Sequence, residues 1–186
     1  AYIVGYEDGS VQPEGDITRA EVATIFFRLL TDETRESYWS QSSGFTDVAS
    51  GAWYNNAVST LTRAGILDGY EDGSFRPNAS ITRAEFTKIA VSFFKHAGGA
   101  SSNPFNDVPD SAWYAEFVKA AAELGLIDGY EDGTFRPNAP ITRAEACTIV
   151  NRTLGRAPDK DNLLPEHEML AWPDNSRDAW YLSLIH

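Results

Sequence analysis

The sequence predicts an all-α protein built from three helix-loop-helix repeats, and three recurring phrases predict it. A glycine-rich phrase Gly-Tyr-Glu-Asp-Gly, a pentad Ile-Thr-Arg-Ala-Glu and an aromatic phrase ending near Trp-Tyr each occur three times in the 186 residues. Self-similarity at a regular period is typical of repeat proteins, whose units bury their apolar faces against one another. Apolar residues at helical spacing follow the phrases, which favours helices as the repeated element.

The first helix of each repeat is expected after the aromatic phrase. That phrase starts at Phe45, Phe105 and Trp172, and it reaches its tryptophan at the same spacing each time. Behind the second of these, Val118 and Ala121 lie on one helical face, and Gly125 stops the pattern, as Gly65 does in the preceding repeat. The glycine-rich phrase that comes next predicts a tight turn, because glycine accepts a positive φ.

The pentad predicts the start of the second helix. Its threonine and its glutamate, three residues apart, form a capping box, in which each side chain satisfies a backbone N–H at the helix start. The pentads begin at Ile17, Ile81 and Ile141. After the first of them, Val22, Ile25, Phe26 and Leu29 keep the i, i+3, i+4, i+7 spacing of a buried helical face. The polar stretch 31–44 is expected to be a connection between units.

The chain opens with a glycine-rich phrase and closes with an aromatic one, so it begins and ends inside a repeat. We therefore expect the C-terminal segment to pack beside the N-terminal half-repeat and to complete a ring of three. Residues 1–186 then form a single module with the following parts: 1–31, the second half of the first repeat; 45–96 and 105–155, two repeats; 156–171, a linker; and 172–186, the first half of the first repeat.

Composition excludes several classes of partner. The formal net charge of −12 disfavours nucleic acid and anionic membrane surfaces, which need basic protein surfaces. No apolar run approaches the roughly 20 residues that span a bilayer, so membrane insertion is not expected. The three histidines share no metal-ligand spacing, and the single cysteine, Cys147, lies in an apolar helical pattern typical of a core residue. Neither a cofactor nor a metal is expected.

The arginine of each pentad has two interpretations. Arg19, Arg83 and Arg143 occupy the first helical position, where a cation meets the positive end of the helix dipole. They either pair with neighbouring glutamates or with a loop aspartate, or they point into a groove and bind an anion beside free backbone N–H groups. The second interpretation predicts that Arg83→Ala and Arg143→Ala weaken binding and leave the thermal midpoint almost unchanged.

Together these phrases resemble the S-layer homology (SLH) domain. The resemblance rests on Phe-x-Asp-Val with Trp-Tyr, on Gly-Tyr-x-Asp-Gly-x-Phe-x-Pro and on Ile-Thr-Arg-Ala-Glu, in that order over most of the chain. It implies a pseudo-threefold trimer of helical repeats. It also implies an extracellular, non-catalytic module of the bacterial cell wall or S-layer that binds secondary cell-wall polysaccharide, commonly through pyruvylated N-acetylmannosamine.

The resemblance also implies which residues bind. It assigns Arg19, Arg83 and Arg143 to the acidic ketal of the sugar, and it makes the turns with Asp8, Asp72 and Asp132 and the tryptophans Trp53, Trp113 and Trp180 walls of the grooves between repeats. A tryptophan at these positions is equally interpretable as a core anchor. The first repeat departs from the pattern, with Val11-Gln12-Pro13-Glu14 in place of Phe-Arg-Pro-Asn and Val4 in place of Asp68 and Asp128.

Parts of the sequence suggest three other functions: calcium binding, glycoside hydrolysis and self-assembly. The stretch 68–79 has acidic residues at some calcium-loop positions, but it has Tyr70 at the third and Ala79 at the twelfth. Paired carboxylates could serve a glycosidase, but here they recur symmetrically in turns and caps. A structural self-assembly module that contacts other surface-layer subunits remains the alternative to polysaccharide binding.

Overall fold

The structure is a computed structural model that describes residues 5–93, 102–156, 172–174 and 181. The described residues contain six α-helices and no β-strand, which confirms the all-α class. The helices are α1 (Arg19–Leu29), α2 (Asp32–Tyr38), α3 (Asn55–Arg63), α4 (Arg83–Phe93), α5 (Ala115–Glu123) and α6 (Arg143–Thr153). Among the described residues, no helix is long and apolar enough to cross a membrane.

The predicted helix starts are confirmed at all three pentads. Helices α1, α4 and α6 each begin at the arginine that follows the capping threonine. Thr18 and Thr142 form complete capping boxes with Glu21 and Glu145. In α4 the Glu85 N–H donates to the Thr82 hydroxyl at 3.3 Å, and the Thr82 N–H donates back to the Glu85 carboxylate at 2.9 Å. The capping signal is local in sequence, which is why it predicts these boundaries well.

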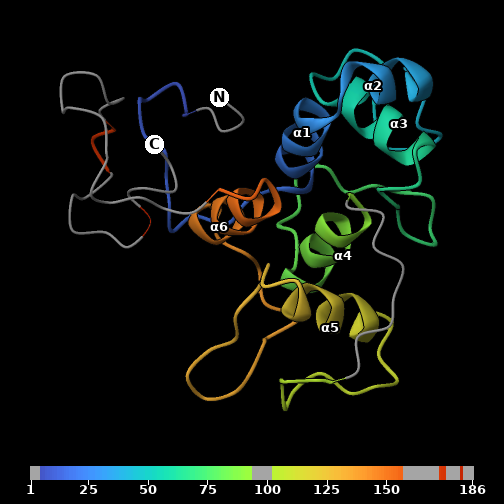
Figure 1. The fold of residues 1–186 in the computed structure, drawn as a ribbon. Coiled ribbons are helices and arrows are strands. Elements are labelled where there is room, and N and C mark those ends of the chain that lie inside the picture. The colour runs from blue at the N-terminus through green and yellow to red at the C-terminus, as the bar shows by residue number, and fades with distance from the viewer. Residues whose placement is uncertain (1–4, 94–101, 157–171, 175–180, 182–186) are drawn as a thin grey trace.

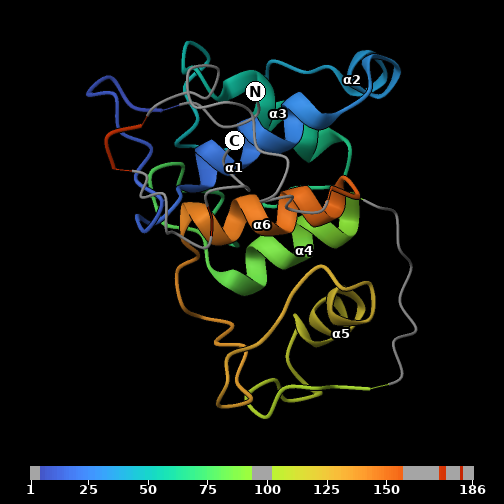
Figure 2. The same cartoon turned by 60° about the vertical axis from the view of Figure 1, so that its left-hand side comes forward.

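The helices pack across the boundaries between repeats. Helix α3 packs mainly on α1 of the preceding repeat, and α5 likewise packs on α4. Figures 1 and 2 show α1, α4 and α6 beside one another, with α3 lying outside α1 and α5 outside α4. Buried residues from all these helices belong to one apolar core.

The stretch 31–44 contains a helix that the sequence analysis missed. Thr31 caps α2 by accepting the Thr34 N–H, and Asp32 and Glu33 lie in its first turn, where acidic residues favour a helix start. None of its seven residues is buried. An apolar stripe is therefore lacking, and that stripe is the signal by which amphipathic helices are recognised.

The residues before α1, α4 and α6 connect the three repeats in a closed cycle. The Ile17 N–H donates to the Ile141 carbonyl at 3.2 Å, the Ile81 N–H to the Ile17 carbonyl at 3.1 Å, and the Ile141 N–H to the Ile81 carbonyl at 3.1 Å. All three isoleucines are fully buried. Each repeat thus contacts both others at the centre, although the pseudo-threefold arrangement of complete repeats stays a prediction.

An aspartate of each aromatic phrase fastens the loop that follows the glycine-rich turn. The Asp107 carboxylate accepts the Phe135 N–H and the Arg136 N–H, both at 2.7 Å, and Asp47 makes the same pair of bonds with Phe75 and Arg76. These bonds hold Arg136 at a φ of 58°, in the left-handed region that non-glycine residues rarely adopt. The sequence analysis assigned no role to these aspartates.

The described part of the C-terminal segment makes the same contacts with the first repeat. The Asp174 carboxylate accepts the Val11 N–H at 2.9 Å and the Gln12 N–H at 2.6 Å. The Trp172 ring lies against Gly5, as the Phe45 ring lies against Gly69. Residues 172–174 therefore contact the first glycine-rich turn as the other aromatic phrases contact theirs. The predicted linker 156–171 and the rest of the segment, except Arg156 and Tyr181, lie outside the described residues.

Removal of the Asp107 carboxylate tests its role. Asp107→Ala leaves two backbone N–H groups without their acceptor, so we expect the free energy of unfolding to fall by about 2 kcal/mol. Asp107→Asn keeps one acceptor oxygen and should lose less. Urea unfolding measures both, with Asp110→Ala as the control, because the side chain of Asp110 is 81% exposed. Equal stability of Asp107→Ala and Asp110→Ala would contradict this role.

Cys147 is a core residue, as predicted. It lies in α6 and is 1% exposed. Burial raises the pKa of its thiol to about 12, so the thiolate is not formed near neutral pH. The position is therefore occupied by a small apolar side chain rather than by a nucleophile.

Candidate functional site

The three pentad arginines are buried at the boundaries between repeats. Arg19, Arg83 and Arg143 are between 4% and 6% exposed, although each stands at the first position of a helix. The Nε–H of Arg19 donates to the Phe75 carbonyl, and that of Arg83 donates to the Phe135 carbonyl, both at 2.8 Å. Arg143 makes the equivalent bond to the Val11 carbonyl. Each side chain thus reaches from its own helix into the next repeat.

The same guanidinium groups form ion pairs with the pentad glutamate of the next repeat. The Nη1 to Oε1 distances are 3.0 Å for Arg19–Glu85, 2.7 Å for Arg83–Glu145 and 2.7 Å for Arg143–Glu21. The three pairs form a second closed cycle, outside the isoleucine cycle. Each glutamate also completes the capping box of its own helix, so one carboxylate links helix initiation to contact between repeats.

Two aromatic rings enclose the guanidinium group in Arg19 and in Arg83, and Tyr6 packs on that of Arg143. Arg83 Cζ lies 4.9 Å from the centroids of both Tyr130 and Phe135, and Arg19 lies similarly between Tyr70 and Phe75. Such cation–π contacts strengthen when they are desolvated. Burial raises the pKa of the Tyr130 hydroxyl, which therefore stays protonated and donates to Glu145 at 3.1 Å.

These contacts correct the expected effect of removing an arginine. The partner is a glutamate, as the structural interpretation held, but it belongs to the next repeat and not to the arginine's own pentad. Because both partners are mostly buried, the arginine cannot be removed without loss of folding stability. We therefore expect Arg83→Ala to lower the thermal midpoint, in place of the small change that the groove interpretation predicted. A structural role does not exclude contact with a ligand, because Arg19 and Arg83 also line cavities.

Two open cavities lie beside the buried pairs. The Arg19 groove has a volume of about 580 Å³ and is lined by Arg19 of α1, the loop before Tyr70, Glu85 and Lys88 of α4, and Trp113. The Arg83 groove has a volume of about 300 Å³ and is lined by Arg83 of α4, the loop 126–130, and residues of α6 that include Glu145 and Arg152. Both are large enough for a sugar residue.

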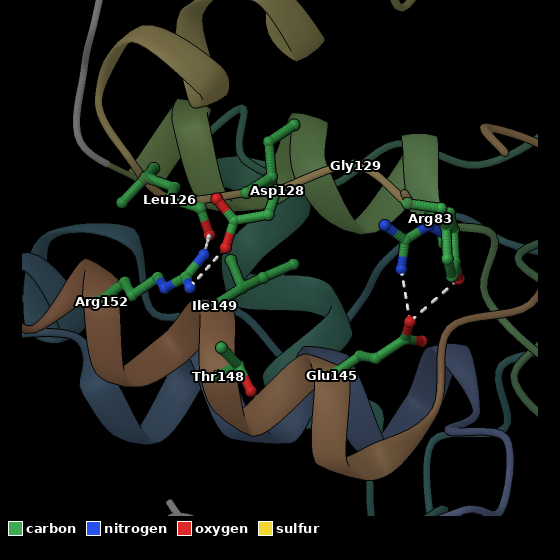
Figure 3. Close-up of a pocket in the computed structure, with 10 residues that line it drawn as sticks. Arg83, Leu126, Asp128, Gly129, Glu145, Thr148, Ile149 and Arg152 are labelled. Atoms are coloured by element: carbon green, nitrogen blue, oxygen red, sulfur yellow. Dashed lines mark hydrogen bonds and ion pairs between the residues drawn. The ribbon is translucent and has the colours of Figure 1, made fainter. Parts of the chain in front are cut away.

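Each groove holds a second cation that the sequence analysis missed. Lys88 pairs with Asp68 in the Arg19 groove. In the Arg83 groove the Arg152 Nη2 lies 2.6 Å from the Asp128 carboxylate (Figure 3). Lys88 stands in the second turn of α4, and Arg152 stands in the last turn of α6. Both residues lie outside the three recurring phrases, so those phrases do not indicate them.

Two of the three tryptophans of the aromatic phrases, Trp53 and Trp113, are surface residues. Trp53 is 67% exposed and Trp113 is 57% exposed, so the core-anchor interpretation is wrong for both. The inward-facing member of the Trp-Tyr pair is the tyrosine: Tyr114 is 9% exposed and meets the Trp113 ring edge-on. Trp113 lines the Arg19 groove. Trp180 lies outside the described residues.

The turn aspartates hold the glycine-rich turns. The Asp132 carboxylate accepts from the N–H and the hydroxyl of Thr134, at 3.0 and 2.6 Å, and it pairs with Arg136. The bonds from Thr134 lower the pKa of Asp132 to about 2. Asp8 and Asp72 make the same bonds with Ser10 and Ser74. Tyr70 and Tyr130, and not Asp72 or Asp132, line the two grooves.

A second arginine stacks on each of these tyrosines. Arg136 Cζ lies 3.8 Å from the centroid of the Tyr130 ring, on which Arg83 also packs. Arg76 and Tyr70 repeat the contact at 4.0 Å. In the first repeat Gln12 stands at this position with a φ of 47°, so the backbone is kept while the guanidinium is lost. With Gln12 in place of an arginine, the first repeat therefore lacks the second guanidinium group that stacks on the turn tyrosine in the other two repeats.

The fold and its grooves define a class of protein: an α-helical repeat module with ligand-sized cavities lined by cations and aromatic rings at the boundaries between repeats. The chain belongs to the S-layer homology domain family. The sequence profile of that domain matches residues 2–23, 44–87 and 104–147, which together are more than half of the chain.

Several proteins similar to this chain are named as surface or anchoring proteins of bacteria. Cell surface glycoprotein 1 of Acetivibrio thermocellus is 41% identical over 169 residues, which cover 85% of this chain and 7% of that protein. The cellulosome-anchoring protein of the same organism is 35% identical over 84% of this chain and 36% of its own length. The surface-layer 125 kDa protein of Lysinibacillus sphaericus is 33% identical over 82% of this chain and 13% of its own length.

The family and these relatives place the chain outside the cell, at the bacterial cell wall. The chain matches only a small part of each relative, from 7% to 36% of their lengths. The relatives thus carry this kind of module alongside much longer sequence.

Proposed function

We propose that the chain is a non-catalytic anchoring module that holds a bacterial surface or S-layer protein on an anionic secondary cell-wall polysaccharide. The ligand we propose is a pyruvylated sugar such as the N-acetylmannosamine ketal. The names of the relatives, which include an anchoring protein and surface-layer proteins, support the anchoring role.

One observation carries the proposal: the Arg19 groove brings a guanidinium, an ammonium group and an exposed tryptophan together in one open cavity. Cations suit the carboxylate of an acidic sugar, and the face of an aromatic ring suits its apolar side. The residues we propose to contact the polysaccharide are Arg19 and Arg83 at the inner ends of the grooves, Arg143 at the third boundary, and the tryptophans Trp53, Trp113 and Trp180, of which Trp113 lines the Arg19 groove.

The pentad arginines have few N–H groups left for a ligand, because they already bond to the protein. In Arg19 three of the five N–H groups already donate, to Phe75, to Glu85 and to the Asp68 carbonyl. We propose that Arg19 and Arg83 form the positive inner wall of each groove without leaving their glutamates. Several such weak sites on one rigid module gain avidity on a polymer that repeats the same sugar.

Purified cell-wall sacculi test the proposal. The chain should sediment with native sacculi, and removal of the secondary polysaccharide, or of its pyruvate groups alone, should abolish sedimentation. Removal of pyruvate alone tests whether the acidic group is needed for binding, and removal of the whole polymer tests whether the polysaccharide is the ligand. Sedimentation that survives both treatments would contradict the proposal and favour a module that assembles with other surface-layer subunits.

A further inference from the structure

The two cations in each groove differ in how firmly the protein holds them. The side chains of Arg19 and Arg83 are 5% and 7% exposed, and their glutamate partners are 18% and 24% exposed. Lys88 and Arg152 are 30% and 34% exposed, and their aspartate partners are 63% and 74% exposed. The first kind of pair holds the repeats together, whereas the second is a solvent-exposed pair.

We propose that Lys88 and Arg152 are the cations that bind the acidic group of the ligand, and that Asp68 and Asp128 occupy them until the ligand arrives. The inference rests on the proposed function, because it assumes an anionic saccharide in the grooves. Lys88 and Arg152, which lie outside every recurring phrase, then exchange their aspartate partner for the ligand, whereas the pentad arginines keep their glutamate partners.

Exposed ion pairs contribute little to stability, so a ligand carboxylate can replace Asp68 at small cost. Displacing Glu85 from Arg19 would instead leave a buried charge without its partner, which is strongly unfavourable. The Asp68 main chain is itself fixed, since its carbonyl accepts from Arg19 Nη2 at 2.9 Å. Only the Asp68 side chain therefore needs to rotate to release Lys88.

The placement of the two cations supports a common role. Thr148 stands in α6 where Lys88 stands in α4, and Ser92 stands in α4 where Arg152 stands in α6. Despite this change of helix position, both cations line a groove and both pair with the aspartate that precedes the turn glycine. The positive charge has been kept in the groove although the residue that supplies it has changed.

Charge balance indicates the kind of ligand. Figure 3 shows the Arg83–Glu145 pair at one end of the groove and the Arg152–Asp128 pair at the other. When Asp128 turns to solvent, Arg152 is left with a single uncompensated positive charge. Each groove therefore suits one carboxylate. In the Arg19 groove, Lys88 Nζ lies 6.0 Å from the centroid of Trp113, so that carboxylate would bind close to an aromatic surface.

The test compares two substitutions within one ion pair. The probe is the pyruvate ketal of N-acetylmannosamine, with the uncharged sugar as reference, and the readout is the NMR signal of the Trp113 indole N–H. We expect Lys88→Gln to weaken binding at this groove about tenfold, and Asp68→Asn to strengthen it about threefold. Asp110→Asn is the matched control, since the Asp110 carboxylate is 81% exposed, pairs with Lys119 and lines neither groove.

The outcomes separate this inference from the proposed function. If the wild-type chain binds neither sugar, the proposed function fails and the inference fails with it. If wild-type and Lys88→Gln chains bind the acidic sugar equally well, the inference alone is overturned. Weaker binding by Asp68→Asn would also overturn it, because the aspartate would then contact the ligand and would not compete with it. Urea unfolding of each variant checks that the fold is intact.

Discussion

Replacing Arg83 with alanine is expected to lower the free energy of unfolding by about 3 kcal/mol, because it leaves Glu145 beside an empty, mostly buried site. The substitution also removes the 2.8 Å bond to the Phe135 carbonyl and the packing between two aromatic rings. Urea unfolding monitored by circular dichroism measures the loss. The effect should extend to the whole module, since Arg83 joins two of the three repeats.

A matched control separates this pair from ion pairs in general. Asp110→Ala removes a carboxylate that is 81% exposed from its pair with Lys119 and should leave the unfolding midpoint almost unchanged. A double-variant cycle with Glu145→Gln then isolates the energy of the Arg83–Glu145 pair itself. If Arg83→Ala unfolds at the same urea concentration as Asp110→Ala, the three pairs do not hold the repeats together.

Gly69→Ala is expected to destabilise the protein by about 3 kcal/mol through steric overlap. A Cβ at this position would lie 2.2 Å from Cε1 of Phe45 and 2.7 Å from the Ser74 carbonyl oxygen. The Phe45 ring is stacked on Phe75 with the centroids 5.6 Å apart, and the carbonyl belongs to the backbone of the turn. Neither neighbour can move aside cheaply, so the aromatic phrase has to shift away from the turn.

Gly51→Ala is the matched control for this prediction. No atom lies within 4 Å of a Cβ placed on Gly51, and its φ is not in the left-handed region. Gly51→Ala should therefore be neutral or slightly stabilising, since alanine restricts the unfolded chain more than glycine does. Equal unfolding midpoints for the two variants would show that the close contact between Phe45 and Gly69 does not constrain the fold.

The sequence predicted those features that depend on neighbouring residues. The capping threonines and glutamates determine where α1, α4 and α6 begin, and both partners of each box lie within four residues of one another. The glycine that ends α3 is equally local. By contrast, the partner of Arg19 is Glu85, and no local rule connects those two positions. The sequence could indicate that Arg19 needs a partner, but not which glutamate supplies it.

The sequence did not indicate two features of the grooves: the exposure of Trp113 and the presence of Lys88 and Arg152. Trp113 and Tyr114 are adjacent aromatic residues, and only the direction of the chain entering α5 decides which of them faces the core. Lys88 and Arg152 lie outside the recurring phrases and at different positions of their helices, so the recurring phrases did not indicate them. In a repeat protein, the residues that differ between copies can carry the function that the copies share.

The central claim is that an acidic wall polysaccharide occupies the grooves between repeats. Its most direct test is a map of amide NMR shifts as a fragment of the pyruvylated polysaccharide is added to the chain. We expect the largest changes around 67–70, Lys88 and Trp113 in the Arg19 groove, and around 126–130 and Arg152 in the Arg83 groove. Changes confined to the exposed aromatic residues Tyr38 and Trp39 at the end of α2, with both grooves unaffected, would contradict the claim.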